Sequence, residues 1–377
     1  MNKGIAIHHQ KPALHEPETV LLAGGSGYVG RAVARLLVER GHRVMVATRS
    51  PMRTTQQLGF PQHQRLAVVR LYSKHLPWKP TAVINLCGEN IGQRRWSKKR
   101  KQALLDSRVK TSQYLISQCF HQWREVKTFI NTSAIGYYGD SGQFWVDEDS
   151  AAGSGFAAEL CGHWEATTDV LPNKIRTATV RLGVVIGPAR RGSALGKMLP
   201  LYKLGLGGTI GNGNHWMSWI HRDDAARLFA FLLENKHCEG SYNGCAPFPI
   251  KYRELNKRLS VQTKRPAIFQ SPAWLLKLLL GEMSSLLLAS QRVTPKRTHQ
   301  DGFRFLYSNF AAAVAQSVSA PTLTPLRPAS KPRPTPAPRS SNRVGGVLTL
   351  VPKLETQTVP ASEAKATKQA ANHTPHR

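Results

Sequence analysis

The segment Val20-Leu21-Leu22-Ala23-Gly24-Gly25-Ser26-Gly27-Tyr28-Val29-Gly30 decides the fold of this 377-residue chain. An apolar run ends at three glycines that stand three residues apart, at positions 24, 27 and 30. Apolar residues then recur on one face of a predicted helix, and a second apolar run follows at residues 44–47. The order strand, glycine turn, helix, strand is typical of the first unit of a dinucleotide-binding fold.

The glycine turn offers a site for a pyrophosphate, because glycines without a Cβ atom let the backbone turn sharply and approach phosphate closely. Backbone N–H groups and the positive end of the helix dipole would face that phosphate. Glycine turns also occur for structural reasons alone, but this position between a strand and an amphipathic helix favours nucleotide binding. The predicted contacts in the turn are Gly24, Gly25, Ser26, Gly27, Tyr28, Val29 and Gly30.

The end of the second predicted strand indicates which cofactor the turn would serve. Enzymes that prefer NAD usually carry Asp or Glu here, which binds the ribose 2′-hydroxyl. This chain has Thr48-Arg49-Ser50, so a guanidinium and two hydroxyls face the position of a 2′-phosphate. An arginine at a strand end is often simply solvated, but beside the glycine turn Arg49 favours NADP(H) over NAD(H).

The formal charge of +30 indicates attraction to polyanions: nucleic acid, an anionic membrane surface or phosphorylated small molecules. The excess of Lys and Arg is spread along the chain, and no known nucleic-acid-binding motif accompanies it. A phosphate-rich ligand or a generally basic proteome is therefore the first interpretation, and a nucleic-acid function the second.

The five cysteines are scattered, at positions 87, 119, 161, 238 and 245, with no C-x-x-C pair. This pattern argues against a disulfide framework and against a zinc site, so we expect no metal and a cytoplasmic location. Residues 1–19 lack the apolar core of a signal peptide. Residues 274–289 are apolar but short and interrupted by charge, so we expect a packed helix there and no membrane span.

Strand-like and helix-like segments alternate after residue 20, which predicts an α/β fold: a Rossmann-type doubly wound parallel sheet. Further strands are expected near residues 66–71, 82–86, 128–131 and 178–182, a long helix at 98–119, and a helix at 225–233 whose N-cap is Asp223 or Asp224. Ligands of such sheets bind at the carboxyl ends of the strands.

Changes in composition divide the chain into four predicted parts. They are a flexible leader (1–18), an NAD(P)-binding Rossmann-like domain (19–249), a smaller α/β substrate-side lobe (250–318) and a disordered tail (319–377). Pro, Ala, Ser, Thr, Lys and Arg dominate the tail, and such a basic, Pro-rich segment cannot bury a core.

With these residues in view, the chain resembles the extended short-chain dehydrogenase/reductase superfamily, and within it an atypical family labelled nucleoside-diphosphate-sugar epimerases. Besides the glycine turn, the resemblance rests on Ser133-Ala134-Ile135-Gly136-Tyr137-Tyr138-Gly139-Asp140 and on many shorter matches. These lie at residues 84–91, 95–96, 107–108, 160–165, 181–185, 196–200, 205–208, 219–221, 265–267, 281–282 and 291–297. The resemblance covers about residues 20–318, without the leader and the tail.

The resemblance implies that the chain binds NADP(H) and acts on a small-molecule substrate whose identity the sequence does not reveal. The cofactor contacts that it implies outside the glycine turn are Thr48, Arg49, Leu86, Cys87, Arg108 and Val185. Two of these have an ordinary alternative: Arg108 as a surface salt-bridge partner, and Cys87 as a small buried hydrophobe.

Active relatives use a Tyr whose phenolate is held by a Lys four residues on, beside a Ser that steadies the substrate oxygen. The corresponding helix here has Leu160 at the Lys position in one alignment, and Ala157 and Cys161 at the Tyr and Lys positions in another. Neither alignment recovers the pair. Ser133 and Tyr138 are the predicted catalytic residues. Tyr137, Glu89 and His221 are further groups able to move a proton, with a structural role before a helix as the alternative for His221.

Three functions follow as hypotheses. The first is an NADP(H)-binding oxidoreductase or epimerase-like enzyme, and the second is a non-catalytic protein that binds NADP(H) and regulates or recognises something else. The third is a protein that binds nucleic acid or an anionic surface. Such a protein would lose its salt-dependent binding of polyanions when residues 319–377 are removed.

Overall fold

A computed structural model describes residues 16–58, 63–189 and 192–319. The predicted tail beyond Ser319 and the leader up to residue 15 lie outside these residues, so the polyanion binding expected of the tail stays a prediction. No helix in the described part of the chain is long and apolar enough to cross a bilayer.

A seven-stranded parallel sheet forms the centre of the fold, in the order β12-β7-β5-β4-β1-β2-β3. Its strands are β1 (Thr19–Ala23), β2 (Arg43–Thr48), β3 (Leu66–Arg70), β4 (Ala82–Asn85), β5 (Thr128–Ala134), β7 (Arg176–Leu182) and β12 (Gly240–Gly244). This order confirms the predicted doubly wound sheet. The edge strand β12 was not predicted, because its sequence, Gly-Ser-Tyr-Asn-Gly, has no apolar run.

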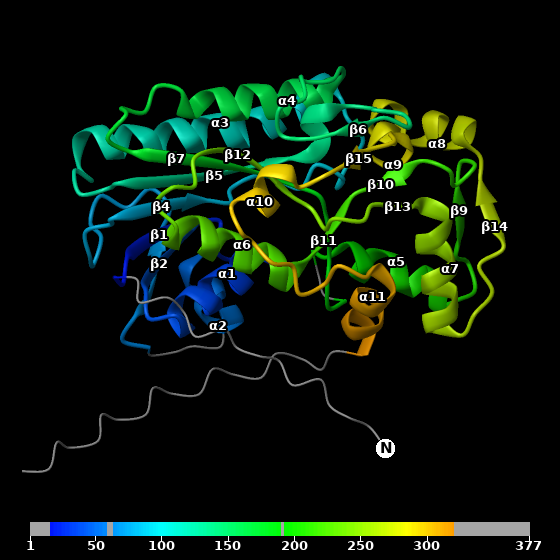
Figure 1. Cartoon of the computed structure of the whole chain (residues 1–377), viewed down its shortest axis with the longest axis horizontal. Helices are drawn as coiled ribbons and strands as arrows, with labels where there is room; N and C mark the ends of the chain where they lie inside the picture. Colours follow the sequence, from blue (N-terminus) through cyan, green and yellow to red (C-terminus); the bar gives the residue numbers. More distant parts are fainter. Residues whose placement is uncertain (1–15, 59–62, 190–191, 320–377) are drawn as a thin grey trace, which may run out of the picture. The chain divides into compact units, whose positions relative to one another are not determined.

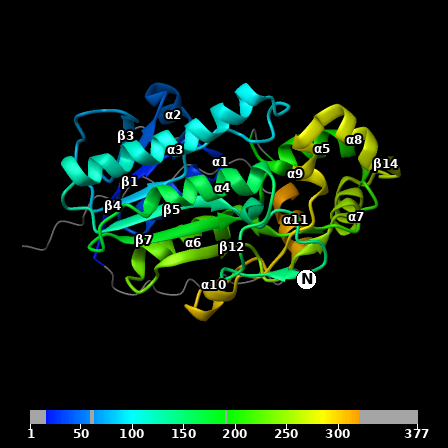
Figure 2. The ribbon, with the colours of Figure 1, turned by 90° about the horizontal axis from the view of Figure 1, so that it is seen from above.

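Helices cover both faces of the sheet (Figures 1 and 2). On one face lie α3 (Lys98–His121) and α4 (Phe156–Glu165), and on the other α1 (Tyr28–Glu39) and α6 (Arg222–Glu234). Alternate residues of β1 point to opposite faces: Val20 and Leu22 join the core under α1 and α6, and Leu21 and Ala23 the core under α3. Burial on both faces explains why β1 has an unbroken apolar sequence.

The C-terminal lobe has a separate core, which contains Trp219, Leu199, Leu255, Leu259 and Phe310. Its helices are α5 (Ala194–Lys203), α7 (Tyr252–Thr263), α8 (Ala273–Leu280), α9 (Ser285–Leu288) and α11 (Phe310–Ser319). Helix α10 (Lys296–Gln300) packs against the edge strand β12 of the main sheet instead. Its parallel pair β9 (Gly208–Ile210) and β14 (Phe269–Ser271) joins segments from before and after residue 250. The boundary predicted at that residue stays a prediction.

Short strands connect the lobe to the main sheet. They pair β8 (Val184–Ile186) with β11 (Trp219–His221), β10 (Trp216–Met217) with β13 (Ile250–Lys251), and β15 (Arg292–Val293) with β6 (Trp145–Val146). Helix α2 (Pro51–Leu58) follows β2.

The expected N-cap of α6 was wrong. His221 is the N-cap, and its Nδ1 accepts a hydrogen bond from the Asp223 backbone N–H at 3.2 Å. Asp224 instead accepts backbone hydrogen bonds from Leu306 and Tyr307, at 3.0 and 2.8 Å. The fully buried His221 ring therefore has a structural role at the start of α6, as its alternative interpretation held.

The packed helix expected at residues 274–289 was also wrong. The segment folds as two short helices, α8 and α9, separated by a 3₁₀ turn, and neither α8 nor α9 buries a residue. Trp274, Leu278 and Leu279 on α8 are 60–67% exposed. Gly281, which follows α8 with a φ of 59°, ends the helix early, because glycine adopts this backbone conformation readily.

Candidate functional site: the carboxyl edge of the sheet

The glycine turn lies where the strand order reverses, with β1 between β2 and β4. Two glycines are required by close backbone contacts. A Cβ on Gly24, whose φ is +78°, would lie 2.6 Å from the Leu86 carbonyl oxygen. A Cβ on Gly30 would lie 2.4 Å from the Gly24 carbonyl oxygen. The turn therefore lies directly against the end of β4, and α1 lies directly against the turn.

The N-terminus of α1 opens toward this edge. Gly27 is the N-cap, and no side chain caps the helix. The Gly27 N–H itself donates to the Gly24 carbonyl oxygen at 3.0 Å. Backbone N–H groups in the first turn of a helix, together with the helix dipole, form a site for an anion.

The end of β2 is held rigidly beside the turn. The Thr48 hydroxyl is buried and lies 3.4 Å from Ser26 Oγ and 3.1 Å from Thr54 Oγ1. Thr54 also donates to the Ser50 carbonyl oxygen at 2.9 Å. Sequence reasoning missed Thr54, because nothing in an isolated hydroxyl on a short polar helix signals that role. Arg49 follows Thr48 and is exposed.

Cys87 and Arg49 face the same region. Loss of hydration raises the pKa of the Cys87 thiol to about 12, and the positive charge of Arg49 opposes this rise. The Cys87 N–H donates to Asn85 Oδ1 at 3.1 Å, and Asn85 Nδ2 donates to Ser112 and Asn131. The Cys87 thiol is therefore neutral and partly exposed, and its role as a cofactor contact stays a prediction. Asn85, fully buried, is a second residue that sequence reasoning missed.

Arg108 is a buried cation behind the end of β4. It donates to the carbonyl oxygens of Leu104 and Glu89 at 3.1 and 3.0 Å, and its guanidinium carbon lies 5.1 Å from the centre of the Trp164 ring. Burial lowers its pKa. Its side chain forms no ion pair with any carboxylate of the described residues, so the surface salt-bridge alternative is wrong.

The segment after β7 completes the edge. Val185 lies in β8 and pairs with Ile220 of β11. Two residues later, a Cβ on Gly187 would lie 2.5 Å from the Tyr28 hydroxyl, which donates to the Pro188 carbonyl oxygen at 3.1 Å. The structure thus brings the predicted glycine turn, Thr48, Arg49, Leu86, Cys87, Arg108 and Val185 to one edge of the sheet.

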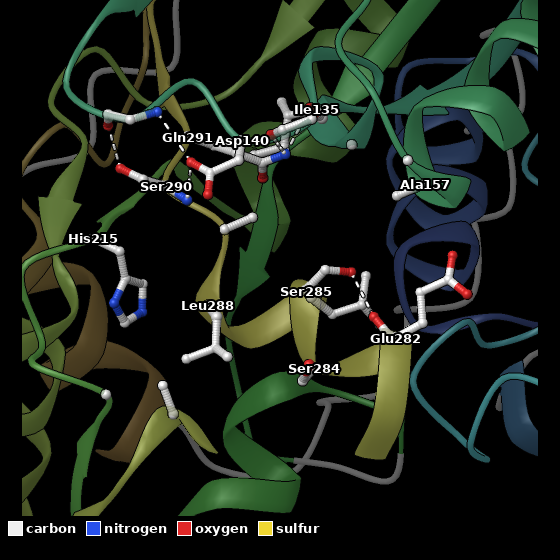
Figure 3. Close-up of a pocket in the computed structure, with 18 of the residues that line it drawn as sticks. Ile135, Asp140, Ala157, His215, Glu282, Ser284, Ser285, Leu288, Ser290 and Gln291 are labelled. Atoms are coloured by element: carbon white, nitrogen blue, oxygen red, sulfur yellow. Dashed lines mark hydrogen bonds between the residues drawn. The ribbon is translucent and has the colours of Figure 1, made fainter. Parts of the chain in front are cut away.

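A cavity of about 1320 Å³ lies between the ends of β5 and β7 and the helices of the C-terminal lobe. Ala157 and Cys161 of α4 line it, and Leu160 packs in a core with Leu104 and Met283. Figure 3 shows Ala157 on one wall, across the cavity from His215 and Leu288. Phe156 lines the cavity as well, so the choice between the two alignments stays open.

The predicted catalytic Ser133 lies at the end of β5 beneath this cavity. Its hydroxyl is buried and has no hydrogen-bond partner of normal geometry among the described residues. The Cys161 thiol, 3.6 Å from the Ala134 carbonyl oxygen, is the group beside it. The catalytic role of Ser133 stays a prediction.

The predicted catalytic Tyr138 lies in the core and does not line the cavity. Its hydroxyl donates to Asn243 Oδ1 at 2.8 Å and accepts from Arg181 at 3.0 Å. Burial raises the pKa of the phenol, so its proton is retained near neutral pH. These contacts favour a structural role for Tyr138, and its catalytic role stays a prediction.

The change Tyr138→Phe tests that distinction. We expect it to lower the free energy of unfolding by about 1–3 kcal/mol, because buried Asn243 and Arg181 each lose a partner. NADPH binding should be unchanged. Urea unfolding and an NADPH titration measure the two quantities. Unchanged stability together with loss of an NADPH-dependent activity would instead support catalysis.

The other proton-transfer groups named from the sequence also have structural contacts. Glu89 forms an ion pair with Arg100. The Tyr137 ring lies 3.5 Å from the guanidinium carbon of Arg181. His215, which sequence reasoning did not consider, does line the cavity. Its Nε2 is buried without a hydrogen-bond partner in the described part of the chain, and burial lowers its pKa.

One group of side chains has the spacing of a metal site, although no metal was expected. The ligand atoms of His237, Cys238 and Asp301 lie within 4.8 Å of one another. Asp301 Oδ2, however, accepts a hydrogen bond from the Tyr242 hydroxyl at 2.6 Å. Burial also raises the pKa of the Cys238 thiol, which disfavours the thiolate that binds metals. Asp301 and Cys238 thus have contacts of their own, and the expected absence of a metal stays a prediction.

Comparison with known proteins agrees with this geometry. Residues 20–244 match the NAD dependent epimerase/dehydratase family, and residues 271–317 match a domain of unknown function, DUF1731. Among relatives, the human epimerase family protein SDR39U1 is 33% identical over 304 residues, which are 80% of this chain and 99% of the relative. YfhF of Bacillus subtilis is 34% identical over 306 residues, 80% and 98% of the two chains.

An Arabidopsis thaliana relative, a SDR39U1 homolog named as chloroplastic, is 34% identical over 296 residues, which are 77% of this chain and 83% of the relative. A cytoplasmic location for the present chain stays a prediction. Among solved structures, human SDR39U1 (isoform 2) with NADPH superimposes with a TM-score of 0.72 and 31% identity, over 80% of this chain and 99% of that one. The UDP-glucose 4-epimerase of Thermus thermophilus, 17% identical over 79% of this chain and 97% of that one with a TM-score of 0.65, shares the fold.

Proposed function

Since the chain belongs to the NAD dependent epimerase/dehydratase family, we propose that it binds NADP(H) and transfers a hydride between this cofactor and a substrate in the adjoining cavity. One observation carries the proposal: the glycine turn and the ends of β2 and β4 meet where the strand order reverses, next to a large cavity. The human relative, 31% identical in structure comparison, is described with NADPH.

The residues at the edge fit a phosphorylated dinucleotide. The uncapped first turn of α1 would hold the diphosphate, and Arg49 would pair with the 2′-phosphate. Arg108 adds a buried positive charge that no carboxylate of the described residues neutralises by an ion pair. Bound NADPH would supply a hydride to a carbonyl carbon, whose oxygen takes a proton from a cavity group or from water.

The proposed reaction does not use the Tyr–Lys acid–base pair of active relatives. Ala157 and Cys161 line the cavity, and in one of the two alignments they take the Tyr and Lys positions. Neither is an acid–base catalyst in this environment. Burial raises the pKa of the Cys161 thiol, so it stays protonated near neutral pH. Ser133 and His215 are the nearest candidates for orienting a substrate oxygen.

Cofactor preference is tested by the change Arg49→Ala. We expect NADPH affinity to fall about 10- to 100-fold, because a charge-assisted contact to phosphate is lost. NADH affinity should be unchanged, since NADH carries no 2′-phosphate. Arg124→Ala is the matched control, because Arg124 is exposed and precedes β5 at the opposite end of the sheet. Equal losses for both nucleotides, or for both variants, would contradict the role of Arg49.

A second candidate is a protein that binds NADP(H) without catalysing hydride transfer. The small, uncharged side chains of Ala157 and Cys161 in the cavity favour it, because they remove the usual proton donor. Incubation of the NADPH complex with a panel of aldehydes, ketones and sugar nucleotides separates the two. Oxidation of NADPH by any member supports the oxidoreductase, and intact binding without oxidation supports the second candidate.

A further inference from the structure

We infer that the cavity takes a neutral substrate with a long apolar body and a single polar oxygen group, and that it does not take a nucleoside diphosphate. This inference rests on the proposed function, whose substrate site it describes. The side chains that line the cavity lie on α4, on α8 and α9, at the end of β7, and on the loops after β4, β5 and β9.

The first observation is the shortage of positive charge. The chain has 52 Lys and Arg residues, yet Lys277 is the one cation among the residues that line the cavity in the described part of the chain. Asp140 and Glu282 line it as well. A diphosphate is normally bound by arginines, or by several N–H groups that converge on its oxygens. Two carboxylates and one exposed lysine do not provide that environment.

Several backbone N–H groups at the cavity are already engaged. Two helices, α4 and α8, begin there. Glu159 places a carboxylate in the first turn of α4, where its negative charge offsets the positive end of the helix dipole. In α8, the Leu275 and Leu276 N–H groups already donate to the Pro272 carbonyl oxygen at 3.1 and 3.2 Å. The Asp140 carboxylate in turn accepts from the Gly142 and Ser290 N–H groups, at 3.0 and 3.1 Å.

The second observation is the apolar wall. Large apolar side chains from separate segments converge on the cavity: Ile91, Ile135, Phe156, Leu182, Leu286 and Leu288. Ala157 and Cys161 extend this surface with two more small, uncharged side chains. Burying apolar surface against such a wall contributes about 25 cal/mol per Å². A hydrocarbon body therefore gains affinity here. The diphosphate of a sugar nucleotide would lose hydration and meet one lysine, with uncharged amides such as Gln143, Asn214 and Gln291 as its other contacts.

The third observation is an unpartnered polar atom on the cavity wall. His215 Nε2 is buried without a hydrogen-bond partner of normal geometry among the described residues, with the Leu287 backbone beside the ring. The ring stacks on Tyr252 with 5.0 Å between centres. Figure 3 shows the ring beside Leu288 at the cavity wall. A buried polar atom without a partner is costly, and a hydroxyl or carbonyl oxygen of the substrate would satisfy it. The apolar wall and this atom together specify the substrate class.

The experiment uses Nile red, a neutral apolar dye, as a fluorescent probe of the full-length protein. We expect saturable binding that decan-2-one displaces and that UDP-glucose and UDP do not. Leu288→Asp should weaken dye binding about tenfold or more, because it places a charge in the apolar wall. Leu278→Asp is the matched control, since Leu278 is 66% exposed on α8 and does not line the cavity. It should leave binding unchanged.

His215→Leu adds a test of the polar contact. It should weaken displacement by decan-2-one about threefold or more, the loss expected for one hydrogen bond, and leave the displacement by decane unchanged. Displacement of the dye by UDP-glucose, or equal losses in Leu288→Asp and Leu278→Asp, would overturn the inference. An NADPH titration of the same samples tests the proposed cofactor function separately from the proposed substrate class. Dye binding without NADPH binding would overturn the proposed function alone.

Discussion

The change Gly30→Ala is expected to weaken NADPH binding about 100-fold, or about 2.7 kcal/mol. It should also lower the free energy of unfolding by about 2–3 kcal/mol. The added Cβ would lie 2.4 Å from the Gly24 carbonyl oxygen and 2.6 Å from the Gly25 Cα atom. Both contacts are to backbone, which cannot rotate away as a flexible side chain would. Helix α1 must therefore move away from the turn, and its first-turn N–H groups move with it.

The matched control is Gly162→Ala, the same substitution inside helix α4. A Cβ there has no neighbour within 4 Å among the residues the structure describes. We expect this change to raise the free energy of unfolding by about 0.5–1 kcal/mol, because alanine favours a helix more than glycine does. Titration with NADPH and urea unfolding measure both variants. Full NADPH affinity in Gly30→Ala would contradict the close packing of α1 on the glycine turn.

The change Arg181→Met is expected to lower the free energy of unfolding by about 3–5 kcal/mol. Arg181 is 5% exposed and donates to both carboxylate oxygens of Glu165, at 2.9 to 3.3 Å. It also donates to the Tyr138 hydroxyl and stacks on the Tyr137 ring. Its removal leaves the mostly buried Glu165 carboxylate without its cation, and an uncompensated buried charge is strongly destabilising.

Lys110→Met is the control, because Lys110 forms an exposed ion pair with Asp106 one helical turn away. We expect a loss below about 0.5 kcal/mol there. The double change Glu165→Gln with Arg181→Met should recover part of the stability lost in Arg181→Met, since no charge is then buried alone. Chemical unfolding of the four proteins gives the comparison. Losses of the same size for Arg181→Met and Lys110→Met would contradict a structural role for the Arg181 network.

The sequence was sufficient to predict the doubly wound sheet, because β1, β2 and β4 are buried on both faces and therefore apolar throughout. The same reasoning could not predict β12, where Tyr242 is the one large apolar side chain. It also assigned the start of α6 to an aspartate, although the His221 ring is the N-cap. Whether a histidine caps a helix depends on the orientation of its ring, and that orientation cannot be predicted from the sequence.

The cofactor side of the site was largely predictable, since the glycine turn and Arg49 are adjacent to strands in the sequence. Thr54 and Asn85 were not, because their importance depends on buried hydrogen bonds to Thr48 and to Asn131. The cavity was the least predictable part. The residues that line it come from segments as far apart in the sequence as Ile91 and Gln291, so no local sequence pattern predicts the cavity.

The most direct measurement is a titration of the purified wild-type protein with NADPH and with NADH, followed by nucleotide fluorescence. We predict that NADPH binds at least about tenfold more tightly than NADH, a difference in binding free energy of about 1.4 kcal/mol. The reason is that NADPH carries the 2′-phosphate that Arg49 would bind and NADH does not. Equal affinity would contradict a 2′-phosphate site at the end of β2. If neither nucleotide bound, the glycine turn would be a structural feature only, and the proposed cofactor function would be wrong.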